Sequence, residues 1–209
     1  MQNDRKHTFI DNFTFSDNIN FTSDLEFALD KADIIVVAVP SHSVRDLISH
    51  ANTFISNSVI IVNISKGLEI DSLLTMSAVI REETAGKDLP IVSLYGPSHA
   101  EEVVKKIPTT LVAASTDENA RKMVQKIFSS SVLRVYTNND ILGIELGGSL
   151  KNVIAIAAGI CDGIGFGDNT KAAILTRGIA EMTRLGVAMG AKEKTFAGLS
   201  GIGDLFVTC

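Results

Sequence analysis

Lys151 lies in the part of the sequence whose residue types best suit chemistry. If residues 140–161 form a helix, one of its faces unites this lysine with small residues, at Gly147 or Gly148, Ala155 and Ala158. A face of small residues favours close approach, so the ammonium would lie in a narrow cleft, where desolvation lowers the pKa of an amine. Such a lysine can act as a general acid or base. The alternative is a lysine whose side chain simply extends to solvent.

An amide and a carboxylate could assist this lysine. Asn152, the next residue, offers a neutral donor and acceptor. Asp204 follows the flexible segment Gly201–Gly203 and precedes an apolar turn, where it could meet the lysine across a cleft. A carboxylate beside an ammonium opposes the effect of burial on the pKa. The residues alone do not decide which effect is larger.

A second lysine, Lys66, comes just after a short apolar run. That run, Val59–Ile64, is typical of a buried strand, and Gly67 follows the lysine. In open α/β sheets, ligands bind beyond the carboxyl ends of the strands. Lys66 could therefore contact an anion or a carbonyl group, or it could be a solvated lysine in a turn.

The segment LYGPSHAEE, residues 94–102, ends another apolar run. Gly96 would let the backbone approach a ligand. Ser98 could cap the following helix, with Glu101 completing a capping box. The N–H groups of that helix could instead bind an anion. His99 and the other three histidines have no metal-ligand spacing, so we expect no metal site.

A sheet and several helices must position these residues. The predicted strands are β-branched apolar runs, at residues 34–39, 59–64, 91–94, 109–114 and 132–136. Helix-like stretches alternate with them, at residues 24–29, 42–54, 72–83 and 117–128. Strands that are apolar nearly end to end and alternate with helices indicate a parallel sheet covered on both faces.

Beyond this α/β part the sequence becomes helical and rich in small residues. The predicted helices there are at residues 140–161, 171–189 and 192–199, and we place the boundary at 138–140. A doubly wound nucleotide-binding domain begins with a strand, a glycine-rich loop and a helix. The first thirty residues contain no glycine. The later GIGFGD, residues 163–168, is no substitute, because it follows a helix and Asp168 replaces the third glycine.

Composition narrows the class of protein further. The 209 residues are 45% hydrophobic and carry a net charge of −5, which suits a globular chain and argues against nucleic-acid binding. The longest apolar runs are shorter than the ~20 residues of a membrane-spanning helix. The first residues lack the apolar region of a signal peptide, and Cys161 and Cys209 have no ligand spacing. We expect a cytoplasmic protein without a membrane span.

Together these motifs resemble bacterial NAD(P)-dependent glycerol-3-phosphate dehydrogenases. The segments that match, in the family's order, are VPSHSVR, SKGLE, YGPSHAEE, the long stretch from GGSLKN to EMTRLG, and GLSGIGDLFVTC. The resemblance implies a partial Rossmann-type dinucleotide-binding domain over residues 1–138 and a partial helical substrate-binding domain over residues 139–209. It also implies a homodimer. The implied reaction is reduction of dihydroxyacetone phosphate to sn-glycerol 3-phosphate by NADPH or NADH, a step of glycerophospholipid synthesis.

The resemblance also assigns roles by position. Lys151 matches the family's catalytic lysine, the general acid that protonates the new alkoxide. The implied substrate contacts are Lys66, Gly96, Ser98, Lys151, Asn152, Asp204 and Thr208. The implied cofactor contacts are Phe9, Lys66 and Ala100.

The sequence departs from the family's pattern at its two ends. The family's opening strand and GxGxxG loop would precede Met1, and its Ser-Arg-Asn stretch would follow Cys209. We therefore expect the chain to be the middle of a longer enzyme, with little or no dehydrogenase activity by itself.

Two other interpretations differ in class. The β-hydroxyacid dehydrogenases favour an asparagine four residues after the lysine, where this chain has Ala155. A preference for a carboxylate over a phosphate substrate would identify that class. The second is an incomplete fragment that acts only as a binding or dimerisation module, and a folded dimer that binds no NADPH would favour it.

Overall fold

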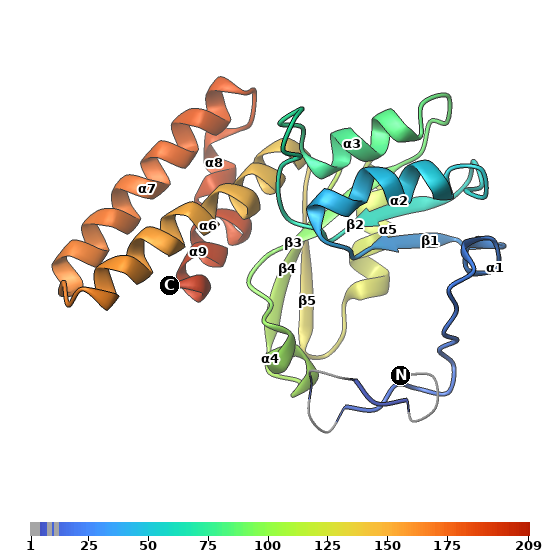
Figure 1. Ribbon diagram of the computed structural model, residues 1–209, viewed down its shortest axis with the longest axis horizontal. Coiled ribbons are helices and arrows are strands. Elements are labelled where there is room, and N and C mark those ends of the chain that lie inside the picture. Colours follow the sequence, from blue (N-terminus) through green and yellow to red (C-terminus); the bar gives the residue numbers. More distant parts are fainter. Residues whose placement is uncertain (1–4, 8–9, 11–12) are drawn as a thin grey trace.

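The computed structural model describes residues 5–7, 10 and 13–209 and has two parts (Figure 1). An α/β part contains the sheet, and a pair of long helices with three short ones lies beside it. The chain passes from the last strand, which ends at Asn138, to the first long helix, which begins at Ile141. This is the point at which the residue pattern changes.

The five predicted strands all form, and they make one sheet. Their bounds are β1 Ile34–Val37, β2 Ile60–Asn63, β3 Ile91–Tyr95, β4 Thr109–Ala114 and β5 Leu133–Asn138, in the spatial order β1-β2-β3-β4-β5. β1, β2 and β3 are parallel to one another, with Val37 opposite Asn63 and Asn63 opposite Ser93. β4 runs antiparallel to β3, with Tyr95 opposite Val112, and β5 is parallel to β4.

The antiparallel β3–β4 pair corrects the prediction of an entirely parallel sheet. A parallel connection must cross the sheet, and a helix of some length usually does so. Residues 96–108 contain only the five-residue helix α4, Ala100–Val104. The chain therefore turns back at the carboxyl end of β3, beginning at Gly96, whose φ is +144°.

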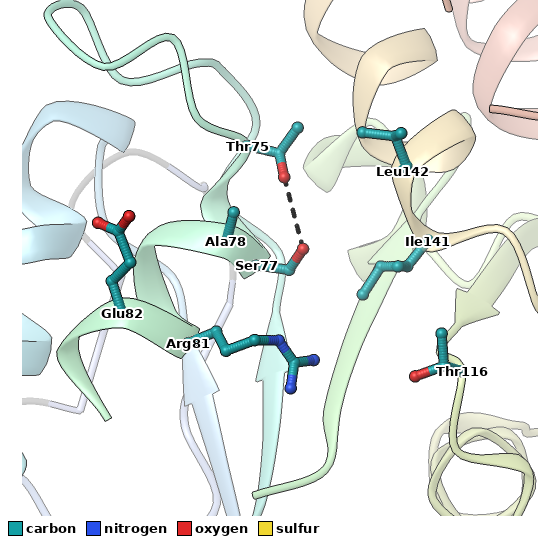
Figure 2. Close-up of a pocket in the computed structure, with 8 residues that line it drawn as sticks. All are labelled: Thr75, Ser77, Ala78, Arg81, Glu82, Thr116, Ile141 and Leu142. Carbon is teal, nitrogen blue, oxygen red and sulfur yellow. Dashed lines mark hydrogen bonds between the residues drawn. The ribbon is translucent and has the colours of Figure 1, made fainter. Parts of the chain in front are cut away.

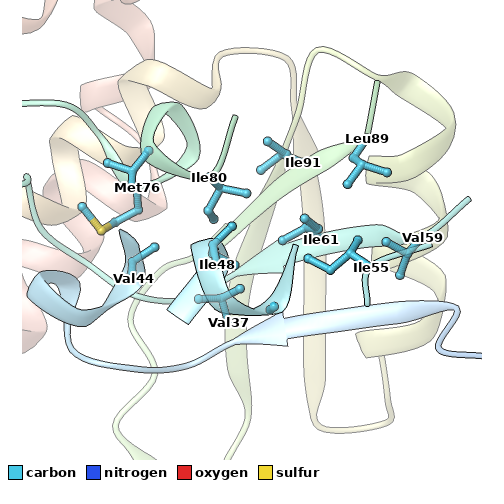
Figure 3. Close-up of a cluster of buried hydrophobic side chains, with 12 residues drawn as sticks. Val37, Val44, Ile48, Ile55, Val59, Ile61, Met76, Ile80, Leu89 and Ile91 are labelled. Atoms are coloured by element: carbon cyan, nitrogen blue, oxygen red, sulfur yellow. The ribbon is translucent and has the colours of Figure 1, made fainter. Parts of the chain in front are cut away.

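Helices cover both faces of the sheet. The bounds in this part are α1 Leu25–Leu29, the 3₁₀-helix Ser41–Ser43, α2 Val44–Ala51, α3 Met76–Glu83 and α5 Glu118–Phe128. Consecutive strand residues point to opposite faces, so Ile61 and Ile91 pack with α2 and α3, whereas Val62 and Val92 pack with α5. Figure 3 shows the first of these clusters, in which Ile48, Ile80 and Ile61 lie together. The predicted two-sided burial is confirmed.

The helical part begins with two long helices. Its bounds are α6 Ile141–Gly163, α7 Asp168–Ala188, α8 Glu193–Phe196, a π-helical turn Leu199–Gly203 and α9 Asp204–Thr208. Buried Asp140 starts α6: its side chain accepts hydrogen bonds from Gly143 N at 3.0 Å and from Thr195 Oγ1 at 2.6 Å. The second bond fixes α8 against the start of α6.

By length and composition, α6 is a helix that could cross a membrane, and 44% of its most apolar window is buried inside the protein. The core helix of a globular protein passes the same test. The short uninterrupted apolar runs predicted no such helix, whereas the mean hydropathy of α6 averages over the small and polar residues between those runs. In this structure α6 packs against α7, α8, α9 and β3.

Candidate active site

Lys151 and Asp204 form a buried ion pair between α6 and α9. Lys151 is 7% exposed and Asp204 is 2% exposed. The Lys151 ammonium donates to Asp204 Oδ1 at 2.7 Å, to Thr208 Oγ1 at 2.6 Å and to the Asp204 carbonyl at 3.3 Å. An ammonium has three hydrogens, so these acceptors use all of them. The predicted meeting of Lys151 with Asp204 is seen here, and the ammonium is buried.

Lys66 binds the other oxygen of the same carboxylate. Its ammonium donates to Asp204 Oδ2 and to the Gly96 carbonyl, the latter at 3.4 Å. The Lys66 side chain is 27% exposed, so it contacts solvent, whereas the Lys151 side chain is buried. The sequence suggested each of these groups separately but not that one aspartate joins both lysines.

Lys151, Asp204 and Lys66 together form a positively charged site that is largely shielded from water. Two ammonium groups and one carboxylate have a net charge of +1 (2 − 1). Desolvation lowers the pKa of Lys66 below its ordinary 10.5, and the charge of Lys151 adds to this effect, whereas Asp204 opposes it. Such a site suits an anion that supplies the missing negative charge.

Two glycines of α6 allow these elements to meet. A Cβ at Gly147 would lie 2.8 Å from the Ser200 carbonyl, and one at Gly148 would lie 2.8 Å from the Tyr95 ring. Both distances are too short for a real side chain. The small face predicted for α6 is therefore the face that contacts the π-helical turn and β3, and it brings Lys151 to Asp204.

A buried carboxylate, Glu145, lies one helical turn before Gly148, and sequence reasoning did not find it. It is 0% exposed and accepts hydrogen bonds from Asn63, Ser77 and Ser93. The signal that could have found it is an acid within an otherwise apolar stretch, ILGIELGG, at the start of α6. Acids in such surroundings are buried only with hydrogen-bond partners.

The remaining predicted site residues are less enclosed. Ser98, Ala100 and Asn152 are exposed, and Phe9 lies outside the described residues. The capping box at Ser98 is wrong: α4 begins at Ala100, and the Ser98 hydroxyl donates to the Gly96 carbonyl at 3.3 Å. Proline at position 97 and the positive φ of Gly96 hold Ser98 before the helix.

A pocket of about 640 Å³ lies between α3 and the start of α6 (Figure 2). It contains none of the predicted site residues, and its lining consists of Thr75, Ser77, Ala78, Arg81, Glu82, Thr116, Ile141 and Leu142. Ser77 belongs both to this pocket and to the surroundings of Glu145. Within the described part of the chain, no three His, Cys, Asp or Glu residues are grouped to hold a metal ion.

Comparison with known proteins places both parts of the chain in one family. Residues 1–121 match the family described as NAD-dependent glycerol-3-phosphate dehydrogenase N-terminus, and residues 140–209 match the corresponding C-terminus. The chain belongs to the NAD-dependent glycerol-3-phosphate dehydrogenase family.

Individual relatives agree with this family. A glycerol-3-phosphate dehydrogenase [NAD(P)+] of Clostridium botulinum (strain Alaska E43 / Type E3) is 50% identical over 99% of this chain and 62% of its own length. One from Fusobacterium nucleatum is 52% identical over 87% of this chain and 54% of its own length. The chain thus spans 62% of the length of the first of these relatives.

Solved structures match the fold as well. A glycerol-3-phosphate dehydrogenase from Coxiella burnetii superposes with a TM-score of 0.91 at 36% identity, over 96% of this chain and 61% of that one. The yeast enzyme GPD1 superposes with a TM-score of 0.86 at 26% identity, over 97% and 60% of the two chains. The partly parallel sheet with flanking helices, followed by a helical part, is thus the fold of glycerol-3-phosphate dehydrogenases.

Proposed function

We propose that this chain takes part in reducing dihydroxyacetone phosphate to sn-glycerol 3-phosphate with NADPH or NADH, a step in glycerophospholipid synthesis. The observation that supports this function is the Lys151–Asp204–Lys66 arrangement, at the boundary of the two parts. It combines a buried proton donor with a net positive site for an anionic substrate. Family membership does not favour the alternative of a module that only binds or dimerises.

Lys151 acts as the general acid. When the carbonyl at C2 is reduced, its oxygen becomes an alkoxide that needs a proton, and the Lys151 ammonium supplies one. All three hydrogens of this ammonium already have acceptors. The substrate oxygen therefore replaces one of them, and exposed Thr208 is the acceptor most easily displaced. Asp204 keeps the ammonium oriented during the exchange.

Lys66, Gly96 and Ser98 would contact the substrate on the side of the sheet. The Lys66 ammonium lies at the carboxyl end of β2 and beside the Gly96 carbonyl, at 3.4 Å. Ser98, which follows in the same loop, and Asn152 on α6 are exposed and offer neutral hydrogen-bond partners. These groups would orient the carbonyl oxygen toward the Lys151 ammonium.

The residues at this edge of the sheet fit a dinucleotide. A Cβ at buried Gly96 would lie 3.0 Å from the Thr110 carbonyl, so this end of β3 packs closely against β4, and the exposed surface here comes from Ser98 and Ala100. The residues that would hold NADPH or NADH are Phe9, Lys66 and Ala100, of which the last is exposed at the start of α4. Bound there, the nicotinamide would supply the hydride. We also propose the two domains that the sequence suggests. Residues 1–138 form a partial dinucleotide-binding domain, and residues 139–209 form a partial helical substrate-binding domain.

A homodimer and a cytoplasmic location complete the proposal. Exposed apolar side chains on α6, at Val153, Ile156 and Ile160, offer a surface for association. Light scattering of the purified chain tests the dimer, and a monomer at all concentrations would contradict it. Cys161 and Cys209 are free thiols in this structure, as reducing surroundings permit.

The experiment that tests the function measures NADPH oxidation on addition of dihydroxyacetone phosphate, together with calorimetric binding of sn-glycerol 3-phosphate. Lys151→Ala is the test variant, and Lys122→Ala on α5, whose ammonium pairs with Glu118 at 2.7 Å, is the control. We expect Lys151→Ala to remove about 10²- to 10⁴-fold of any turnover, and Lys122→Ala to leave turnover and binding unchanged. Binding of 3-hydroxybutyrate but not of the phosphate would contradict the proposal.

A further inference from the structure

Glu145 is surrounded by hydrogen-bond donors. Its Oε1 accepts from Asn63 Nδ2 at 3.2 Å, from Ser77 N at 2.9 Å and from Ser93 Oγ at 2.8 Å, and its Oε2 accepts from Ser77 Oγ at 2.6 Å. The donors come from β2, α3 and β3. All of these partners are neutral, so the carboxylate is stabilised by hydrogen bonds alone.

These hydrogen bonds continue to the residue before Lys66. Asn63 Nδ2 also reaches the Tyr95 hydroxyl at 3.1 Å and the Ser65 carbonyl at 3.2 Å. Asn63 Oδ1 accepts from Ser65 N at 3.0 Å, and the Tyr95 hydroxyl donates to the Ser65 carbonyl. Glu145 therefore orients an amide that holds Ser65 by both of its backbone groups.

A second connection leads to the residue after Lys66. The Ser149 hydroxyl donates to the backbone carbonyl of Glu145 at 2.7 Å and accepts from Gly67 N at 3.1 Å. Gly67 has a φ of +144°, and a Cβ there would lie 2.7 Å from Ser41 Oγ, so its backbone has little freedom. The two residues that flank Lys66 are thus both tied to Glu145.

We propose that Glu145 is a positioning residue for Lys66. Its side chain, through Asn63, and its carbonyl, through Ser149, fix Ser65 and Gly67, so that the Lys66 ammonium meets Asp204 and the Gly96 carbonyl. The value of this for substrate binding rests on the proposed function of Lys66. The position of Lys66 itself is independent of that function and can be measured without substrate.

Two substitutions distinguish the role of Glu145 as a hydrogen-bond acceptor from the role of its negative charge. Glu145→Met keeps the length of the side chain but removes the carboxylate acceptor of Ser77 and Ser93 and one of the three acceptors within reach of Asn63 Nδ2. Glu145→Gln can keep a carbonyl oxygen at the Oε1 position and turn its amide nitrogen toward the Ser77 hydroxyl, which can accept. We therefore expect Glu145→Gln to rescue the position of Lys66.

Asp140 provides a matched control on the same helix. It is 6% exposed and its carboxylate accepts from Gly143 N, Lys192 N and Thr195 Oγ1, all of which lie in the helical part. Asp140→Leu removes a buried carboxylate from α6 without touching the connection to Lys66. A general loss of packing would affect both variants alike.

The measurement is acetylation of Lys66 by acetic anhydride over a pH series, quantified by mass spectrometry. The side chain of Lys31 is 89% exposed and serves as the reference amine in each sample. In the unmodified chain, desolvation lowers the pKa of Lys66 below its ordinary 10.5, the charge of Lys151 adds to this effect and Asp204 opposes it. In Glu145→Met, release of the loop hydrates Lys66, and we expect its midpoint to move up toward 10.5.

The outcomes divide as follows. An upward shift in Glu145→Met that is reversed in Glu145→Gln and absent in Asp140→Leu supports the proposal. An unchanged midpoint in Glu145→Met, or an equal shift in Asp140→Leu, overturns it. If Glu145→Met does not fold, Asn63→Ser breaks the same connection without removing the carboxylate, and an unchanged midpoint there also overturns it. A shift of Lys66 in a chain that binds no sn-glycerol 3-phosphate would contradict the proposed function but not this role of Glu145.

Discussion

At the scale of single residues, the site depends on one aspartate that serves two lysines. Asp204 is 2% exposed, and each of its carboxylate oxygens binds a different ammonium. In the low-dielectric interior, a charge is tolerated only with its partner. Asp204 therefore stabilises the fold as well as orienting Lys151.

Asp204→Asn tests that dependence. The amide cannot balance two ammonium groups, so we expect the free energy of unfolding to fall by about 3–5 kcal/mol, as when one partner of a buried pair is removed. Urea denaturation measures the change. Thr208→Val removes a neutral acceptor from exposed Thr208 and should cost far less. Equal losses in the two variants would show that charge balance is not what Asp204 provides.

Lys66 makes the free energy of unfolding depend on pH. Its pKa in the folded chain is below 10.5, so between that lowered value and pH 10.5 the unfolded chain binds more protons than the folded one. The free energy of unfolding contributed by Lys66 therefore rises with pH across this window and is lost as the pH falls through the folded pKa. We expect Lys66→Met to flatten the slope in urea titrations over this window. A steeper slope in the variant would reverse the sign of this argument.

At the scale of secondary-structure elements, the glycines of α6 make close contacts at the start of the helix but not near its end. A Cβ at Gly147 would lie 2.8 Å from the Ser200 carbonyl, whereas a Cβ at Gly159 would have no atom within 4 Å. We expect Gly147→Ala to lower the melting temperature and to weaken binding of sn-glycerol 3-phosphate, because it pushes the π-helical turn that leads into α9 away from α6. Gly159→Ala should stabilise the chain by about 0.5–1 kcal/mol through helix propensity. Differential scanning calorimetry of both variants checks the pair.

Arg45 joins α2 to α3 and to the loop that follows Lys66. Its guanidinium binds Glu69 at 2.6 Å, Glu82 at 2.9 Å and Glu83 at 2.5 Å. Hydrogen bonds from Arg45 and Ser72 lower the pKa of Glu69 to about 2. The stability from this cluster is present above the ordinary pKa of 4.5 and is lost as the pH falls toward 2.

Replacing this arginine therefore changes acid unfolding. We expect Arg45→Met, which keeps an apolar stem, to unfold at lower temperature at neutral pH and to lose less stability between pH 4.5 and 2 than the unmodified chain. Thermal melts at several pH values measure both effects. Parallel melting curves for the two proteins at every pH would contradict the assignment to Glu69.

The sequence predicted where the strands lie, but it predicted neither the direction of each strand nor all the partners of the buried charged side chains. All five strands could be predicted, because apolar runs such as Val59–Ile64 mark buried strands in either direction. For the same reason they did not reveal that β4 is antiparallel to β3. The Lys151–Asp204 pair could be anticipated from its residue types, but the Lys66 contact to the same aspartate joins positions 138 residues apart. Glu145 was overlooked because its partners come from three separate elements.

At the scale of the whole molecule, α6 links the two parts. Ile144 packs with Tyr95 and Val112, and farther along the helix Leu146 packs with Met182 and Phe196. A helix with buried side chains in both clusters cannot leave one of them without disturbing the other. We expect a single unfolding transition, with the slowest amides of β3 and α6 exchanging at the same free energy. Two separate transitions would show that residues 1–138 and 139–209 unfold independently.

The position of Tyr95 has a practical consequence for optical measurements. The chain contains no tryptophan and two tyrosines, so the fluorescence excited in the tyrosine band comes from Tyr95 and Tyr136 alone. Tyr95 is fully buried with the Lys66 ammonium 5.6 Å from its ring centre, whereas Tyr136 is 44% exposed. Tyr136→Phe would leave a single native fluorophore beneath the lysine site. Ligands that draw Lys66 away from that ring could then be followed by emission, without any attached dye.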